Sequence, residues 1–162
     1  MENAASAEIV VGVDGSQQSV EALRWAARLA PALGARIRAV GAWEYPPEYA
    51  GYVPLGSDNF DEITQKRVDQ AVREAFGEDV PPGLSTSVVF GHPSKVLVQE
   101  SDDASMLVVG RRGHGGFRGL LLGSVSAACV THARCPVLVL HEHPEAERTR
   151  EAQRTREAER TE

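Results

Sequence analysis

The chain lacks the long apolar runs and the abundant cysteines that mark two large classes of protein. No stretch of its 162 residues reaches the roughly 18 consecutive apolar residues of a membrane span, and its first residues are acidic rather than basic. We therefore expect neither a membrane span nor a secretory signal peptide. Its two cysteines have a C-x5-C spacing that matches no zinc or redox motif. We expect a cytoplasmic protein in which Cys129 and Cys135 are small, reduced core residues.

Basic residues are also scarce. The sequence has 17 Lys and Arg against 23 Asp and Glu, a formal net charge of −6. This balance disfavours broad binding to nucleic acid or to an anionic membrane. His141 and His143 lie on one side of an expected extended segment, but no further metal ligands are near them in the sequence. We therefore expect no metal site there.

Five apolar runs alternate with helical patterns. We expect strands at residues 8–13, 37–43, 86–90, 106–109 and 137–140, and helices at 16–34, 59–76, 93–100 and 124–132. Alternating strands and helices indicate parallel strands joined by right-handed crossovers. The sequence thus predicts an α/β, Rossmann-like fold, a doubly wound five-stranded parallel sheet with helices on both faces, in one domain over residues 1–143.

Two segments fall outside this alternation. Residues 44–57 carry three Pro and three Tyr without periodicity. They form either a lid over the strand ends or a loop whose aromatic side chains cover the sheet edge. Residues 144–162 contain three hexapeptide repeats, EAERTR, EAQRTR and EAERTE, whose alanines form no helical stripe. We expect a disordered or marginally helical tail, with a partner-binding arm as the alternative.

The most informative feature is a glycine-rich segment between an expected strand and an expected helix. It runs GRRGHGGFRGLLLGS, with the spacing Gly110-x2-Gly113-x9-Gly123-Ser124. A helix start presents unpaired N–H groups and a partial positive charge, and glycine lets the backbone approach an oligophosphate closely. The segment therefore predicts a phosphate site, although a purely structural turn gives a similar pattern.

The familiar phosphate motifs do not fit this segment. The motif G-x-x-x-x-G-K-[ST] is absent, because Gly123 is followed directly by Ser and no Lys is near it. The third glycine of G-x-G-x-x-G, counted from Gly113, falls on Arg118. P-loop kinases and GTPases and NAD dehydrogenases are therefore disfavoured. Arg111 and Arg112, together with Arg118, form a local basic cluster that either contacts phosphate or is simply solvated.

The spacing G-x2-G-x9-G-[ST] resembles the signature of the ATP-binding branch of the universal stress protein family, and every fixed position is present. The resemblance extends to IVVGVDGSQQSVEALRWAARLA at residues 9–30 and to CPVLVL at residues 135–140. It implies an ATP-binding protein, with Mg²⁺ carried on the phosphates rather than held in a protein cage.

Asp14 directly follows the first expected strand, where a carboxylate can bind ribose hydroxyls or simply order the turn before the next helix. The resemblance implies the ribose role, and it implies that the backbone of Ala42 faces the adenine. The other residues that it implies are Gly12 and Val109 lining the pocket, Gly110, Arg112 and Gly113 around the phosphates, and Gly123, Ser124, Val125 and Ser126 at the helix start.

The sequence offers weak support for catalysis. His114 and the arginines of the loop have no carboxylate pair beside them to supply a base for hydrolysis. A nucleotide-dependent stress-response regulator with a protein partner is therefore favoured over a dimeric interaction protein and over a slow ATP hydrolase. The uncharged strand Val137–Leu140 lies at a sheet edge in the fold that the resemblance implies, which predicts a homodimer through that strand.

Overall fold

The computed structural model describes residues 7–49, 59–112 and 122–141 and the single positions 152, 156 and 160. The tail expected at 144–162 lies outside the described residues apart from those three positions. Five strands form one sheet in the order β3-β2-β1-β4-β5, and all four neighbouring pairs are parallel. The strands are β1 (Glu8–Gly12), β2 (Arg36–Trp43), β3 (Ser85–Phe90), β4 (Met106–Gly110) and β5 (Val137–Leu140).

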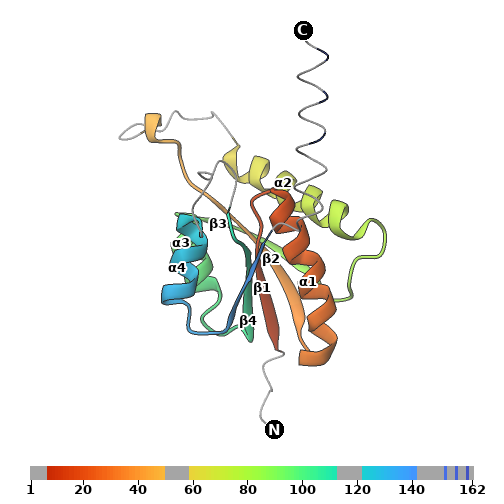
Figure 1. Ribbon diagram of the computed structural model, residues 1–162. Helices are drawn as coiled ribbons and strands as arrows, with labels where there is room; N and C mark the ends of the chain where they lie inside the picture. Colours follow the sequence, from red (N-terminus) through yellow and green to blue (C-terminus); the bar gives the residue numbers. More distant parts are fainter. Residues whose placement is uncertain are drawn as a thin grey trace.

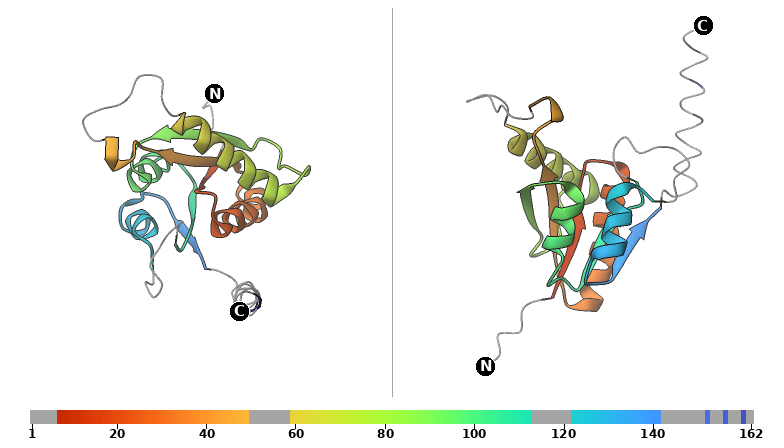
Figure 2. Two further views of the ribbon diagram at one scale, coloured as in Figure 1. Left: turned by 90° about the horizontal axis from the view of Figure 1, so that it is seen from above. Right: turned by 90° about the vertical axis from the view of Figure 1, so that its left-hand side faces the viewer.

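Helices cover both faces of this sheet, which confirms the expected doubly wound fold. They are α1 (Gln17–Leu33), α2 (Phe60–Phe76), α3 (Pro93–Glu100) and α4 (Ser124–His132), with a short 3₁₀ helix, η1 (Pro47–Tyr49), after β2. Helices α1 and α2 pack on one face, and α3 and α4 pack on the other (Figures 1 and 2). Within the described residues, no helix is long and apolar enough to cross a membrane.

Local sequence signals set the helix ends. The Ser16 side chain accepts a hydrogen bond from the Ser19 N–H and caps α1, and Gly34 ends that helix in the left-handed conformation at φ 57°. Pro93 is the first residue of α3, as expected. The strands differ from expectation by one residue at four ends: β1 stops at Gly12, β2 and β3 each begin one residue earlier, and β4 includes Gly110.

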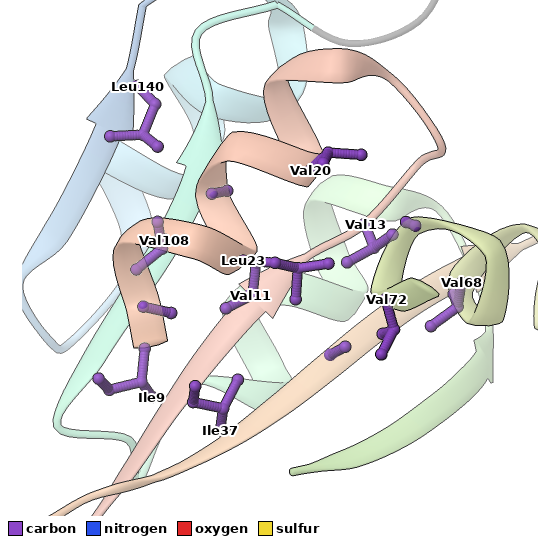
Figure 3. Close-up of a cluster of buried hydrophobic side chains, with 14 of the residues drawn as sticks. Ile9, Val11, Val13, Val20, Leu23, Ile37, Val68, Val72, Val108 and Leu140 are labelled. Atoms are coloured by element: carbon purple, nitrogen blue, oxygen red, sulfur yellow. The ribbon is translucent and has the colours of Figure 1, made fainter. Parts of the chain in front are cut away.

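Two apolar clusters hold the helices against the sheet. The larger one joins α1 and α2 to the sheet through side chains such as Val11, Leu23, Val68 and Val108 (Figure 3). On the opposite face, Val10, Leu97 and Cys129 belong to the cluster that holds α3 and α4. Cys129 is buried and Cys135 is half-buried against the same cluster, and both are free thiols, so the expectation that they pack as core residues is confirmed.

Candidate functional site

The carboxyl ends of β1 and β4 form the point where the chain connections diverge. From β1 the chain continues to β2 on one side, whereas β4 is followed by β5 on the other. Helices α1 and α4 both begin at this end of the sheet, which is the upper end in Figure 1. In open α/β sheets such a switch point leaves a crevice in which ligands bind.

The end of β4 and the start of α4 are joined through one carbonyl group. The Arg111 carbonyl accepts a hydrogen bond from the Gly123 N–H at 2.8 Å and another from Ser126 Oγ at 2.6 Å. The Arg111 N–H in turn donates to the Leu140 carbonyl at 2.7 Å, which extends the ladder between β4 and β5. The end of β4, next to Arg111, and the start of α4, at Gly123, therefore lie side by side.

The first turn of α4 presents backbone donors at this point. The N–H groups of Ser124, Val125 and Ser126 belong to the helix start, where no carbonyl of the same helix can accept them. Gly123 is the capping position and has no side chain to occupy them. The Ser124 side chain is exposed, whereas that of Ser126 is 3% exposed and already donates within the protein. Ser124 is therefore the hydroxyl of this turn that is available to a ligand.

A residue that the sequence did not single out fixes the other side of this segment. Gln18 of α1 is 8% exposed, and its Oε1 accepts the Arg112 N–H at 2.9 Å. The packing there is tight, because a Cβ on Gly110 would lie 2.7 Å from Gln18 Cβ. Gln18 is the first of four buried positions spaced four apart on α1, followed by Ala22, Ala26 and Ala30. A polar residue among these apolar positions was the signal in the sequence that Gln18 has a hydrogen-bonding role.

The packing beside Gln18 gives Gly110 a structural role. Gly110 is the last residue of β4, where it pairs with Leu140, and the phosphate contact predicted for it stays a prediction. The absence of a side chain is required there by contact with α1, whether or not a phosphate is bound. At Gly12 an added Cβ would lie 2.7 Å from Leu97 Cδ1 of α3, so the Leu97 side chain would have to move to accept one.

Asp14 forms the turn between β1 and α1. Its Oδ1 accepts the Ser16 N–H at 2.9 Å, and Ser16 then caps the helix. Gly15 has φ +84°, which favours glycine. The turn-forming role is therefore confirmed. The half-buried carboxylate lies at the carboxyl end of β1, so the predicted ribose contact stays a prediction compatible with this turn.

The structure brings the predicted pocket residues to one face of the sheet. Val109 belongs to the cluster against α3 and α4, and Ala42 and Val125 pack against it. A Cβ on Gly12 would lie 3.3 Å from Val109 Cγ1. Val125 belongs to the first turn of α4, so this apolar cluster adjoins the backbone donors of that turn, and a ligand with an apolar ring and an anionic group would find both kinds of contact.

The charges near β4 suit an anion. Among the described residues, Arg111 Nε is the one buried side-chain nitrogen or oxygen atom without a hydrogen-bond partner, and Arg112 adds a second guanidinium group next to it in sequence. Within the same residues, no group of three or more His, Cys, Asp or Glu could hold a metal ion. Gly113, His114, Arg118 and His143 lie outside the described residues, as does most of the predicted lid.

Comparison with known proteins shows which proteins this chain resembles. The sequence model of the universal stress protein family matches residues 7–141. Universal stress protein Rv2623 of Mycobacterium tuberculosis is 32% identical over 145 residues, which are 85% of this chain and 48% of that protein. The chain thus spans about half the length of the first curated relatives it matches.

Two further proteins match over nearly their whole length. A universal stress protein of Thermus aquaticus is 33% identical over 137 residues, which are 82% of this chain and 96% of that protein. The crystal structure of a universal stress protein in complex with cAMP is 30% identical, with a TM-score of 0.54, and the match covers 83% of this chain and 96% of the other.

Proposed function

Since this chain belongs to the universal stress protein family, we propose that it binds an adenine nucleotide at the carboxyl ends of β1 and β4 and acts as a nucleotide-dependent regulator in the stress response. The hydrogen bonds from Gly123 and Ser126 to the Arg111 carbonyl carry this proposal. They hold the first turn of α4 against the backbone of Arg111, in a segment that also carries the guanidinium groups of Arg111 and Arg112. That arrangement matches the charge and donor pattern that phosphate requires.

The remaining predicted residues account for the ribose and the adenine of the nucleotide. We assign Asp14 to the ribose hydroxyls, the backbone of Ala42 to the adenine, and Gly12 and Val109 to the pocket wall. The adenine assignment is supported by the related structure that contains cAMP. We propose ATP as the preferred ligand, because the arginines and the first turn of α4 together provide more donors than one phosphate group needs. Mg²⁺, where present, would be held mainly by the phosphates.

A regulatory role is supported by the connections that meet at the site. Gln18 links the segment after β4 to α1 on one face of the sheet, and Gly123 links it to α4 on the other. A phosphate bound between these links would bias the arrangement of both helices and of the segment that joins them. We further propose a homodimer through β5 and a cytoplasmic location, the latter supported by the free thiols.

The proposal is tested by identifying the nucleotide that the purified protein carries and by calorimetric titration with ATP. We expect Ser124→Ala to weaken binding about ten- to hundredfold, because one hydrogen bond to a charged group is lost. Gly123→Val should abolish binding while the protein stays folded, since φ −70° at Gly123 is accessible to any residue. Wild-type affinity in Gly123→Val would contradict the assignment of the phosphate site.

A further inference from the structure

Five aromatic side chains from separate parts of the chain form a continuous cluster beside β3. Trp43 at the end of β2 contacts Phe90 at the end of β3 and Tyr45, with ring centroids 4.8 and 5.4 Å apart. Phe60, the first residue of α2, lies 6.0 Å from both Tyr45 and Tyr49. The rings meet mostly edge to face, a favourable arrangement for aromatic pairs. We call these five residues the aromatic cluster.

The aromatic cluster is more exposed than a structural core would be. Phe90 is 58% exposed and Tyr45 is 37% exposed. Strand β3 is the outermost strand on its side of the described sheet, so no further strand of that sheet covers Phe90. Contiguous exposed apolar side chains of this size mark binding surfaces more often than isolated ones do.

The aromatic cluster lies on the other face of the sheet from the proposed nucleotide pocket. Ala42 packs towards α3 and α4, and side chains alternate between faces along a strand. Trp43, the next residue, therefore lies on the α2 face, as its contacts through Tyr45 to Phe60 also require. The cluster is thus a surface separate from the nucleotide site, although both are at the carboxyl end of β2.

Exposed carboxylates flank members of the cluster in the sequence. Exposed acidic residues that are direct sequence neighbours of cluster members or one position further include Glu48, Asp61 and Glu62. The nearest lysine along α2 is Lys66, one turn beyond Glu62. The surface therefore combines aromatic rings with a predominantly negative rim, which we call the acidic rim.

We propose that the aromatic cluster and its acidic rim form a docking surface for a basic, arginine-containing segment of a partner protein. A guanidinium group stacks on aromatic rings and at the same time forms ion pairs with carboxylates, while its aliphatic stem covers apolar surface. The same kind of pairing exists elsewhere in this chain, where the Arg28 guanidinium lies 5.0 Å from the ring centre of Trp25. An acidic partner would be repelled by the rim.

Tryptophan fluorescence provides a direct test. The chain has two tryptophans, so Trp25→Phe leaves Trp43 as the reporter within the cluster. We expect a short peptide of alternating Arg and Leu to change the Trp43 emission saturably, and a matched peptide of Glu and Leu to have no effect. Phe90→Ala should weaken binding about tenfold through loss of cation–π and stem contacts. Val130→Ala on α4 is the apolar control, since Val130 is 51% exposed against 58% for Phe90.

A charge-matched pair of variants separates docking from general attraction to an acidic protein. Glu48→Gln with Asp61→Asn removes two charges from the rim, and Glu78→Gln with Asp79→Asn removes two exposed charges after α2. We expect only the first pair to weaken the peptide, and we expect ATP affinity to be unchanged in both. Equal weakening by both pairs, or binding that is insensitive to Phe90→Ala, would overturn the proposal.

Discussion

The Gln18 side chain accepts a hydrogen bond from the Arg112 backbone N–H, 94 positions away in the sequence, at a distance of 2.9 Å. Gln18 is buried in the first turn of α1, and Arg112 is the last described residue before the glycine-rich loop. The contact therefore sets where that loop leaves the sheet, relative to the turn formed by Asp14.

Substitutions at Gln18 should separate its structural role from an electrostatic one. Gln18→Leu keeps most of the volume but leaves the Arg112 N–H without its acceptor, so the free energy of unfolding should fall by about 1–3 kcal/mol. Gln18→Glu keeps an acceptor but adds a negative charge near the proposed phosphates. We expect ATP affinity to fall about tenfold, a cost of about 1.4 kcal/mol. Denaturant titration and calorimetry measure the two effects.

Gln17→Ala is the matched control for these variants. Gln17 is exposed and donates to Glu74 on α2 rather than to the loop. Its replacement should leave ATP affinity unchanged. If Gln18→Glu binds ATP as tightly as the unmodified protein, the phosphates do not lie beside this end of α1.

Gly41 should be intolerant of even one methyl group. An added Cβ would lie 2.7 Å from Val68 Cγ2 and 2.9 Å from Thr64 Cγ2, where α2 crosses β2. Gly41→Ala should therefore destabilise the fold by about 1–3 kcal/mol through overpacking. Val68→Ala makes room, so the double variant should be more stable than the sum of the two single effects predicts. Strictly additive unfolding energies would show that the two sites are not in contact.

A proline at one position of β5 should test the proposed dimer without disturbing the sheet. The carbonyls of Pro136 and Leu140 accept hydrogen bonds from β4. Backbone groups of successive residues point to opposite sides of a strand, so the N–H and carbonyl of Val139 point away from β4, towards the open edge. Val139→Pro removes an outward N–H and is compatible with an edge strand. We expect dissociation to monomers by light scattering with little change in the unfolding midpoint. A dimer that persists in this variant must form through another surface.

Stability should fall at alkaline pH because of Cys129. Burial, with a smaller contribution from Cys135, raises the pKa of the Cys129 thiol from 9.0 to about 11. The folded state therefore holds this proton more tightly than the unfolded chain does. Its contribution to stability is complete below pH 9 and is lost as the pH rises to about 11.

Unfolding midpoints measured across this pH range check the effect, and Cys129→Ala should reduce the dependence. Alkylation at mild pH, followed by mass spectrometry, should modify the half-buried Cys135 much faster than the buried Cys129. Rapid modification of Cys129 in the folded protein would contradict the cause assigned to its pKa.

Signals carried by neighbouring residues determined the secondary structure and the family. Ser16, Gly34 and Pro93 mark helix ends because capping and backbone restriction act within a few residues. The alternation of apolar runs and helical patterns predicted the parallel sheet for the same reason. The glycine spacing that begins at Gly110, together with residues 9–30 and 135–140, was sufficient to indicate the family, because each of these patterns belongs to one continuous segment.

Contacts between distant segments were decided only by the tertiary structure. The hydrogen bond between Gln18 and Arg112 joins residues 94 positions apart, and no sequence pattern marks it. Trp43 and Phe90 meet because β2 and β3 pair in register. Gly110 shows the limit most clearly. Its place in the glycine spacing predicted a phosphate contact, and only the packed helix revealed that contact with Gln18 also requires the missing Cβ, because that constraint is set by a neighbour in space.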